Sequence, residues 1–152
     1  MNKIFILLLF TLSPFYSFSQ SEWQDLAVTE DMEVYIDPSS IKDVDGRIYA
    51  KTKTIYTTQN ARNAYVGKIK NVFKKDADKK ISKWNSFSYT IAYGLYDCTN
   101  KRFKILEVQD YGSDNTKIIQ TKTLEDKSRW LEVDVDTVGD YLLFYICDYE
   151  NK

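Results

Sequence analysis

The sequence SFSYTIAYGL, residues 86–95, alternates large apolar side chains with small ones and is the strongest strand signal in the chain. A period of two places the large side chains on one face of a β-strand and the small ones on the other. Turn-forming residues at 98–101 and 110–115 separate this strand from two further β-prone runs, 102–109 and 116–123. None of these connections is long enough for a parallel crossover, so we predict an antiparallel meander.

The chain before this meander also carries strand signals. Residues 23–29 and 32–36 are short β-prone runs separated by two acidic residues, which predicts a hairpin. We expect the second strand to stop at residues 37–40, because Pro38 donates no hydrogen bond to a ladder and because Asp and Ser favour turns.

A second hairpin is indicated by Asp45 and Gly46, a pair common in two-residue turns. The following strand, residues 47–57, places Lys51 and Lys53 on the face opposite to its apolar side chains. We therefore expect this face of the sheet to be exposed to solvent over part of its length.

Residues 60–80 change character and indicate an amphipathic helix, with a mobile basic loop as the alternative. The apolar residues at helical spacing are Tyr65, Ile69, Val72 and Phe73. The lysines that fill the rest of the surface are Lys68, Lys70, Lys74, Lys75, Lys79 and Lys80. These six lysines are a candidate binding site for an acidic partner, and a solvated helix face is the plainer interpretation.

Near the C-terminus, Thr137 followed by Asp140 is typical of a capping box and favours a helix over residues 138–149. A buried strand is the alternative for the apolar run inside this segment. Together the elements predict an α+β fold, in which an antiparallel sheet of about six strands carries a C-terminal helix and an additional basic helix.

The first 20 residues have the parts of a secretory signal peptide: a cationic start, an apolar run over residues 4–12 and a polar end. The apolar run is too short for a membrane span, which needs ~20 residues. We expect cleavage near Gln20, a mature domain over residues 21–152 without an integral membrane segment, and a location in the periplasm, at the cell surface or in the medium.

The composition excludes several classes of function. The 21 basic and 22 acidic residues nearly balance, which argues against nucleic-acid binding. The absence of histidine excludes Ser-His-Asp and Cys-His catalysis and imidazole metal ligands. The acidic run 132–140 fails as a calcium loop because Val138 and Tyr145 fall at ligand positions. We therefore expect no enzyme, cofactor or metal site, although a hydrolase that uses carboxylates alone stays open.

The two cysteines, Cys98 and Cys147, are most simply interpreted as one disulfide in an exported protein, with two buried free thiols as the alternative. The three tryptophans, Trp23, Trp84 and Trp130, could line a carbohydrate or peptide groove. Aromatic side chains in a small β domain more often build the core, which we prefer here.

Several motifs recur together along almost the whole mature chain. They are Trp23, the set Tyr35, Asp37, Ser40 and Ile41, the pair Asp45 and Gly46, the run Tyr96, Asp97 and Cys98, then Trp130 and Cys147. In this order they resemble the surface-adhesin protein E family. The chain departs from the family in its basic segment, residues 60–80, and in lacking a lipoprotein cysteine.

The resemblance implies a curved antiparallel sheet with the C-terminal helix held against it by a bond between Cys98 and Cys147. It also implies an exported, non-catalytic binding domain that adheres to extracellular matrix or other surface proteins. The ligand would be a protein or a polysaccharide. The alternative is a periplasmic envelope protein with a structural or inhibitory role.

Overall fold

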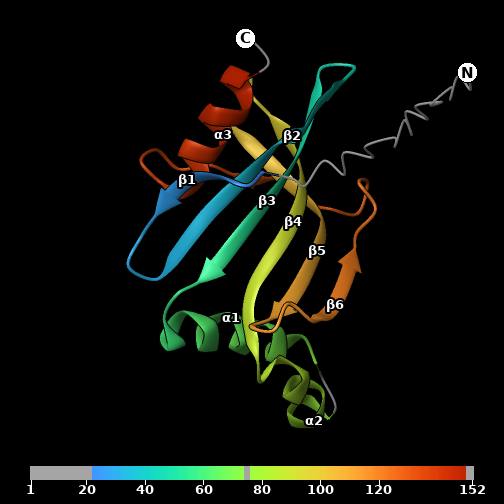
Figure 1. Ribbon diagram of the computed structural model, residues 1–152. Helices are drawn as coiled ribbons and strands as arrows, with labels where there is room; N and C mark the ends of the chain where they lie inside the picture. The colour runs from blue at the N-terminus through green and yellow to red at the C-terminus, as the bar shows by residue number, and fades with distance from the viewer. Residues whose placement is uncertain (1–21, 74–75, 150–152) are drawn as a thin grey trace, which may run out of the picture.

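The computed structural model describes residues 22–73 and 76–149 (Figure 1). The expected signal peptide, Lys74 and Lys75 lie outside the described residues. The strands are β1 (Gln24–Val28), β2 (Met32–Val44), β3 (Arg47–Tyr56), β4 (Phe87–Asp97), β5 (Arg102–Gly112), β6 (Lys117–Lys122) and β7 (Leu131–Glu132). The helices are α1 (Gln59–Val72), α2 (Ala77–Ile81), the short 3₁₀ helix η1 (Ser82–Trp84) and α3 (Val138–Tyr149).

The sheet is an antiparallel meander in which β1 to β6 lie side by side in chain order, and the short β7 pairs with β5. The alternating run 86–95 forms β4, which pairs along its length with β3 and β5. The hairpin predicted at Asp45 and Gly46 joins β2 to β3, and Gly46 adopts a φ of +76° that suits glycine. The α+β fold with its antiparallel sheet is therefore confirmed.

Strand β2 continues through Pro38, so the prediction that it stops at residues 37–40 is wrong. The hydrogen-bond ladder with β3 is interrupted between Asp37 and Lys42. Pro38 lies in this irregular stretch, where the ladder requires no hydrogen bond from its nitrogen. The Ser40 hydroxyl spans the gap: it donates to the Asp37 carbonyl at 2.6 Å and accepts from the Lys51 N–H at 2.8 Å. A side chain thus replaces the missing backbone bond.

Strand β5 likewise runs on to Gly112, beyond the predicted start of a turn at Asp110. Asp110 pairs with Thr90 of β4 and is only 1% exposed. Its carboxylate accepts hydrogen bonds from the Tyr65 hydroxyl at 2.7 Å and from the Trp84 Nε1–H at 2.6 Å. These two donors come from the helices and offset the cost of burying a carboxylate.

The core lies between α3 and one face of the sheet. It is formed by Ile36, Ile41, Ile48, Ala50 and Tyr96 from the strands and by Leu142, Leu143 and Ile146 from the helix. The helix begins as the cap predicts, since the Asp140 N–H donates to the Thr137 Oγ1 at 3.2 Å. The predicted disulfide between Cys98 and Cys147 is present and ties the end of β4 to α3.

Segment 60–80 forms two helices, α1 and α2, instead of one. Helix α1 begins at Thr58, whose side chain accepts from the Ala61 N–H at 3.1 Å. Tyr65 packs inward and stacks on Phe87 with ring centroids 4.6 Å apart. Val72 was expected on this apolar face, but its side chain is 76% exposed and does not pack there.

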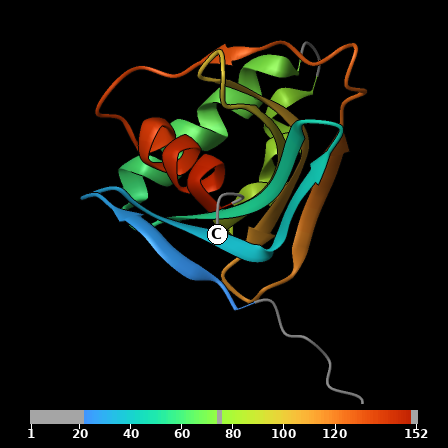
Figure 2. The same cartoon turned by 90° about the horizontal axis from the view of Figure 1, so that it is seen from above.

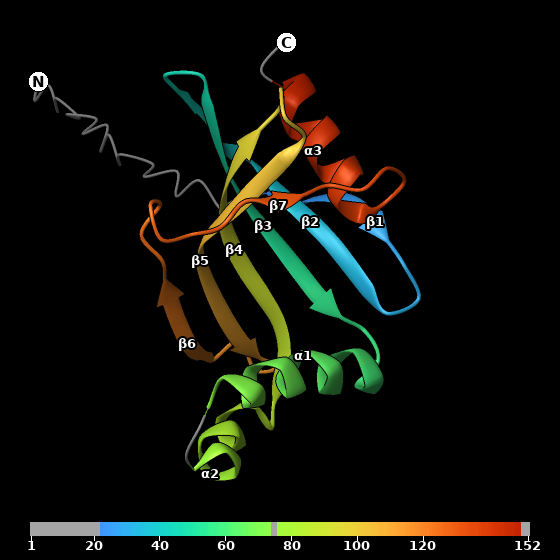
Figure 3. The ribbon, with the colours of Figure 1, turned by 180° about the vertical axis from the view of Figure 1, so that it is seen from behind.

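Helices α3 and α1 lie on the same side of the sheet, α3 near one end and α1 across the other, and α2 lies beyond that second end (Figure 3). Seen from above, the strands curve around this side (Figure 2). Among the described residues, none of the helices has the length and apolar character that a bilayer crossing requires. None of the helices in residues 22–73 and 76–149 covers the opposite side of the sheet.

Candidate binding surface

We define the open face as the side of the sheet that points away from α1 and α3. Its central residues follow from the strand register, in which Lys51 lies opposite Tyr93 and Tyr93 lies opposite Glu107. The residues at alternate positions share this side. They are Lys51 and Lys53 of β3, Tyr89, Ile91 and Tyr93 of β4, and Glu107, Gln109 and Tyr111 of β5.

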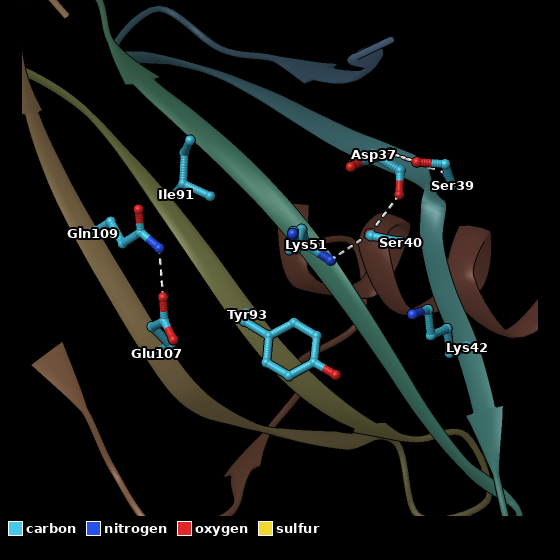
Figure 4. Close-up of a pocket in the computed structure, with 9 residues that line it drawn as sticks. All are labelled: Asp37, Ser39, Ser40, Lys42, Lys51, Ile91, Tyr93, Glu107 and Gln109. Atoms are coloured by element: carbon cyan, nitrogen blue, oxygen red, sulfur yellow. Dashed lines mark hydrogen bonds between the residues drawn. The ribbon is translucent and has the colours of Figure 1, made fainter. Parts of the chain in front are cut away.

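A pocket of about 450 Å³ is hollowed into the open face. Strands β2 to β5 all contribute to it, and its side chains project away from α3, which lies behind the sheet (Figure 4). It is lined by Asp37, Ser39, Ser40, Lys42, Lys51, Ile91, Tyr93, Glu107 and Gln109. Four of these residues belong to the irregular stretch of β2, so the interruption of the ladder forms one wall.

The β2 wall holds a fixed carboxylate beside two lysines. Asp37 Oδ1 accepts from the Ser39 N–H at 3.1 Å and from the Ser39 hydroxyl at 2.6 Å. Lys42 and Lys51 are exposed, and neither ammonium forms an ion pair with any residue that the structure describes. This wall therefore carries two ammonium groups against one carboxylate, and neither ammonium is engaged in an ion pair within the described residues.

The β5 wall is a closed polar network around Glu107. Gln109 and Gln120 donate to Oε1, and Lys122 pairs with Oε2 at 3.1 Å. Burial acts to raise the pKa of Glu107, but the hydrogen bonds from Gln109 and Lys122, the charge of Lys122 and the bond from Gln120 together lower it. Glu107 is consequently an ionised, well-bonded wall residue and a poor proton donor.

Tyrosine rings cover much of the open face between these walls. Tyr49 stacks on Tyr93 with centroids 5.8 Å apart, and Tyr89 stacks on Tyr111 at 4.8 Å. The Lys53 ammonium lies 4.6 Å from the centroid of the Tyr89 ring, within cation–π range. Burial raises the pKa of Tyr93 above its ordinary value, so its hydroxyl stays neutral at physiological pH.

The predicted lysine site lies elsewhere, on α1 and α2 beyond the end of the sheet (Figure 1). Lys68, Lys70, Lys79 and Lys80 are exposed, while Lys74 and Lys75 fall outside the described residues. Lys70 pairs with Asp78, and the Lys80 ammonium lies 5.2 Å from the Phe73 ring centroid. None of the pocket-lining residues comes from these helices.

The three tryptophans do not share a groove. Trp84 is buried under α1, as the core interpretation predicts, and Trp23 precedes the edge strand β1. Trp130 lines a separate pocket of about 340 Å³ and lies under two cations, with the Arg102 guanidinium 4.5 Å and the Lys104 ammonium 4.6 Å from its ring centroid. A common aromatic cleft is therefore absent from the described part of the chain.

The local sequence pattern does not indicate the pocket, although it places Lys51 on a solvated face of the sheet. The pocket combines residues from four strands whose register is not readable from local pattern. The clearest signal was the run of residues 37–40, where a carboxylate and two hydroxyls cluster in what turned out to be a bulged strand. Turn-forming residues inside a β region can mark a bulge that redirects side chains.

A sequence model described as surface-adhesin protein E matches residues 23–148. Among solved structures, Haemophilus influenzae protein E superposes with a TM-score of 0.50 at 13% identity, over 88% of this chain and 89% of that chain. Crystal form II of Haemophilus influenzae protein E gives a TM-score of 0.48 at 13% identity, over 84% of this chain and 94% of that chain. No curated protein sequence matches this chain. At such identity the structural likeness concerns the fold alone.

Proposed function

This chain belongs to the surface-adhesin protein E family, and we propose on that basis that it is an exported, non-catalytic protein that binds a surface protein or a polysaccharide. The observation that carries the proposal is the open face. One side of the sheet is packed against helices, whereas the other presents stacked tyrosines and a charged pocket. Aromatic rings interspersed with polar groups are typical of recognition surfaces.

The state of the Glu107 carboxylate supports binding over hydrolysis. Glycoside hydrolysis needs one carboxyl group that is protonated and donates to the leaving group, beside a second one that is ionised. Glu107 is held ionised by its neighbours, so it is poorly suited to act as a general acid.

Export and surface exposure are tested in the native host. We expect protein recovered from its cells to begin within a few residues of Ser21, because the apolar run of the N-terminus ends at Leu12. Protease added to intact cells should degrade it, while a periplasmic marker protein survives. Retention of Met1 would contradict export. Protection together with the marker would favour a periplasmic envelope protein with a structural or inhibitory role.

The lysines of α1 and α2 are proposed as a second, electrostatic contact for an acidic partner. We expect Lys68→Gln/Lys79→Gln to slow association with an immobilised sulfated polysaccharide or acidic matrix protein by roughly two- to fivefold at low salt, because exposed charges steer encounter. The difference should shrink at physiological salt, where the Debye length is ~8 Å. Association rates from surface plasmon resonance at two salt concentrations measure both effects.

The matched control is Lys101→Gln/Lys127→Gln, which removes the same charge from exposed positions on other turns. It should leave the association rate nearly unchanged. Neither variant should move the thermal midpoint appreciably, since exposed charges contribute little to stability. Equal slowing by the two variants would mean that net charge, rather than this lysine site, governs encounter.

A further inference from the structure

We propose, on the premise of the binding function above, that the pocket of the open face binds an acidic sugar, a pyranose that carries a carboxylate or a sulfate. The volume of about 450 Å³ falls within the ~300–1,000 Å³ typical of small-ligand sites. The pocket thus accommodates one projecting group of a larger molecule. A flat protein interface would leave this hollow unfilled.

The two lysines supply the contact for the acidic group. Lys42 and Lys51 flank the β2 wall, and their ammonium groups have no carboxylate partner among the described residues. By contrast, Lys122 on the opposite wall is already paired with Glu107 at 3.1 Å. The anion is therefore expected at the β2 side of the pocket, where charge-assisted hydrogen bonds remain to be made.

Tyr93 supplies a platform for the sugar ring. It lies between the two walls and shows the flat of its ring to the open side in Figure 4. Its ring stacks on the ring of Tyr49 at an interplanar angle of 18°, which restricts its movement. The C–H groups of a pyranose pack well on such a face, and Ile91 extends the apolar surface next to it.

Unused hydrogen-bonding groups fit the hydroxyls of a sugar. Both hydrogen bonds to the Asp37 carboxylate go to Oδ1, which leaves Oδ2 without a partner among the described residues. The Tyr93 hydroxyl likewise makes no hydrogen bond to the described part of the chain. A carboxylate that accepts and a phenol that accepts or donates match vicinal hydroxyl groups.

This mixture of charges favours a sugar over an acidic peptide. The pocket contains the carboxylates of Asp37 and Glu107 as well as the two free lysines. A polyanionic peptide would bring further negative charge against these carboxylates, whereas a sugar presents hydroxyl donors to them. A single acidic group in a ring of hydroxyls is thus the better complement.

The test uses the protein purified after export with its own N-terminal segment, and three probes. The probes are a uronate-containing disaccharide, a neutral disaccharide of the same linkage, and an acetylated acidic peptide. Calorimetry gives the Kd, and ¹⁵N NMR titration shows which amides shift. We expect the uronate disaccharide to bind and to shift amides of β2, Tyr93 and Gln109. The neutral disaccharide should bind about tenfold more weakly, because it forgoes charge-assisted hydrogen bonds.

Lys42→Gln/Lys51→Gln should weaken binding of the uronate disaccharide by about tenfold or more and leave the neutral disaccharide unaffected. Both lysines are exposed, so this variant should fold normally. The matched control is Lys53→Gln, on the same strand and face but outside the pocket, which should change the Kd less than about twofold. Tyr93→Leu should weaken the binding of both disaccharides, and Tyr93→Phe should weaken it less.

Equal affinity for the two disaccharides, tighter binding of the peptide, or amide shifts confined to α1 and α2 would overturn the proposal. So would a failure of the uronate disaccharide to shift any pocket amide at millimolar concentration. Binding to matrix proteins that ignores Lys42→Gln/Lys51→Gln would reject the sugar pocket and leave the binding function intact. Sugar binding by a protein that intact cells shield from protease would keep the pocket and reject the adhesin role.

Discussion

The free energy of unfolding of the Cys98→Ser/Cys147→Ser variant is expected to be about 3 kcal/mol lower than that of the oxidised protein. The bond joins residues 49 positions apart, for which the chain-entropy relation gives an upper value of ~4 kcal/mol. The loss would be a large fraction of the ~5–15 kcal/mol that stabilises an ordinary domain. Equilibrium urea unfolding of the two proteins measures it directly.

Reduction of the natural protein provides the control, because reduced protein and the double serine variant should share one urea midpoint. The oxidised protein should show no titratable thiol even when denatured. An unchanged midpoint in the variant would mean that packing of Leu142, Leu143 and Ile146 against the sheet holds α3 unaided. The disulfide would then serve kinetic protection instead of equilibrium stability.

Asp110→Ala is expected to cost about 3 kcal/mol, because it leaves the buried Trp84 Nε1–H and the Tyr65 hydroxyl without their acceptor. These two bonds connect η1 and α1 to β5, so the helical end of the molecule should loosen first. Urea unfolding gives the magnitude, and amide hydrogen exchange shows whether α1 loses protection before β4.

Asp110→Asn is the matched comparison, since an amide can accept from Trp84 and donate to Tyr65 without a buried charge. At neutral pH we expect its free energy of unfolding to lie within ~1 kcal/mol of that of the natural protein. A loss as large as that of Asp110→Ala would show that the charge itself, and not the pair of hydrogen bonds, is what the site requires.

The difference in free energy of unfolding between the natural protein and Asp110→Asn should also change with pH in a defined direction. Burial raises the pKa of Asp110, while the bonds from Trp84 and Tyr65 only partly oppose it. Between the unfolded pKa of ~3.9 and the higher folded pKa, the folded state then binds more protons than the unfolded state. Stability due to Asp110 is present below that pH and is lost as pH rises through the folded pKa. The natural protein should therefore lose stability relative to Asp110→Asn over this window. Parallel profiles of the two proteins would contradict the assignment.

Local patterns predicted the elements well where a single segment carries its own signal. The alternation in residues 86–95, the turn at Asp45 and Gly46, and the cap at Thr137 each define an element without reference to distant residues. The cysteine pairing required only that the chain has two cysteines and that export was expected. These features are set by backbone geometry and local hydrogen bonding, which nearby residues determine.

The errors occurred where distant residues override a local preference. Pro38 signals a strand end, but the Ser40 side chain and a register shift carry the strand past it. Asp110 signals a turn, but donors 45 and 26 positions earlier in the chain satisfy it inside the core. The pocket of the open face depends on the same long-range register. No pattern within a single segment encodes these contacts.

The pairing of β3 with β4 also determines which connections of this fold can vary in length and which cannot. The two strands remain in register up to Ile55 and Tyr89, so α1, α2 and η1 together form the loop of one hairpin. Lengthening a loop is cheap, about 0.6 kcal/mol for each doubling. Insertions and deletions between relatives should collect at this end. The opposite end, where the disulfide joins the turn after β4 to α3, should keep a fixed length.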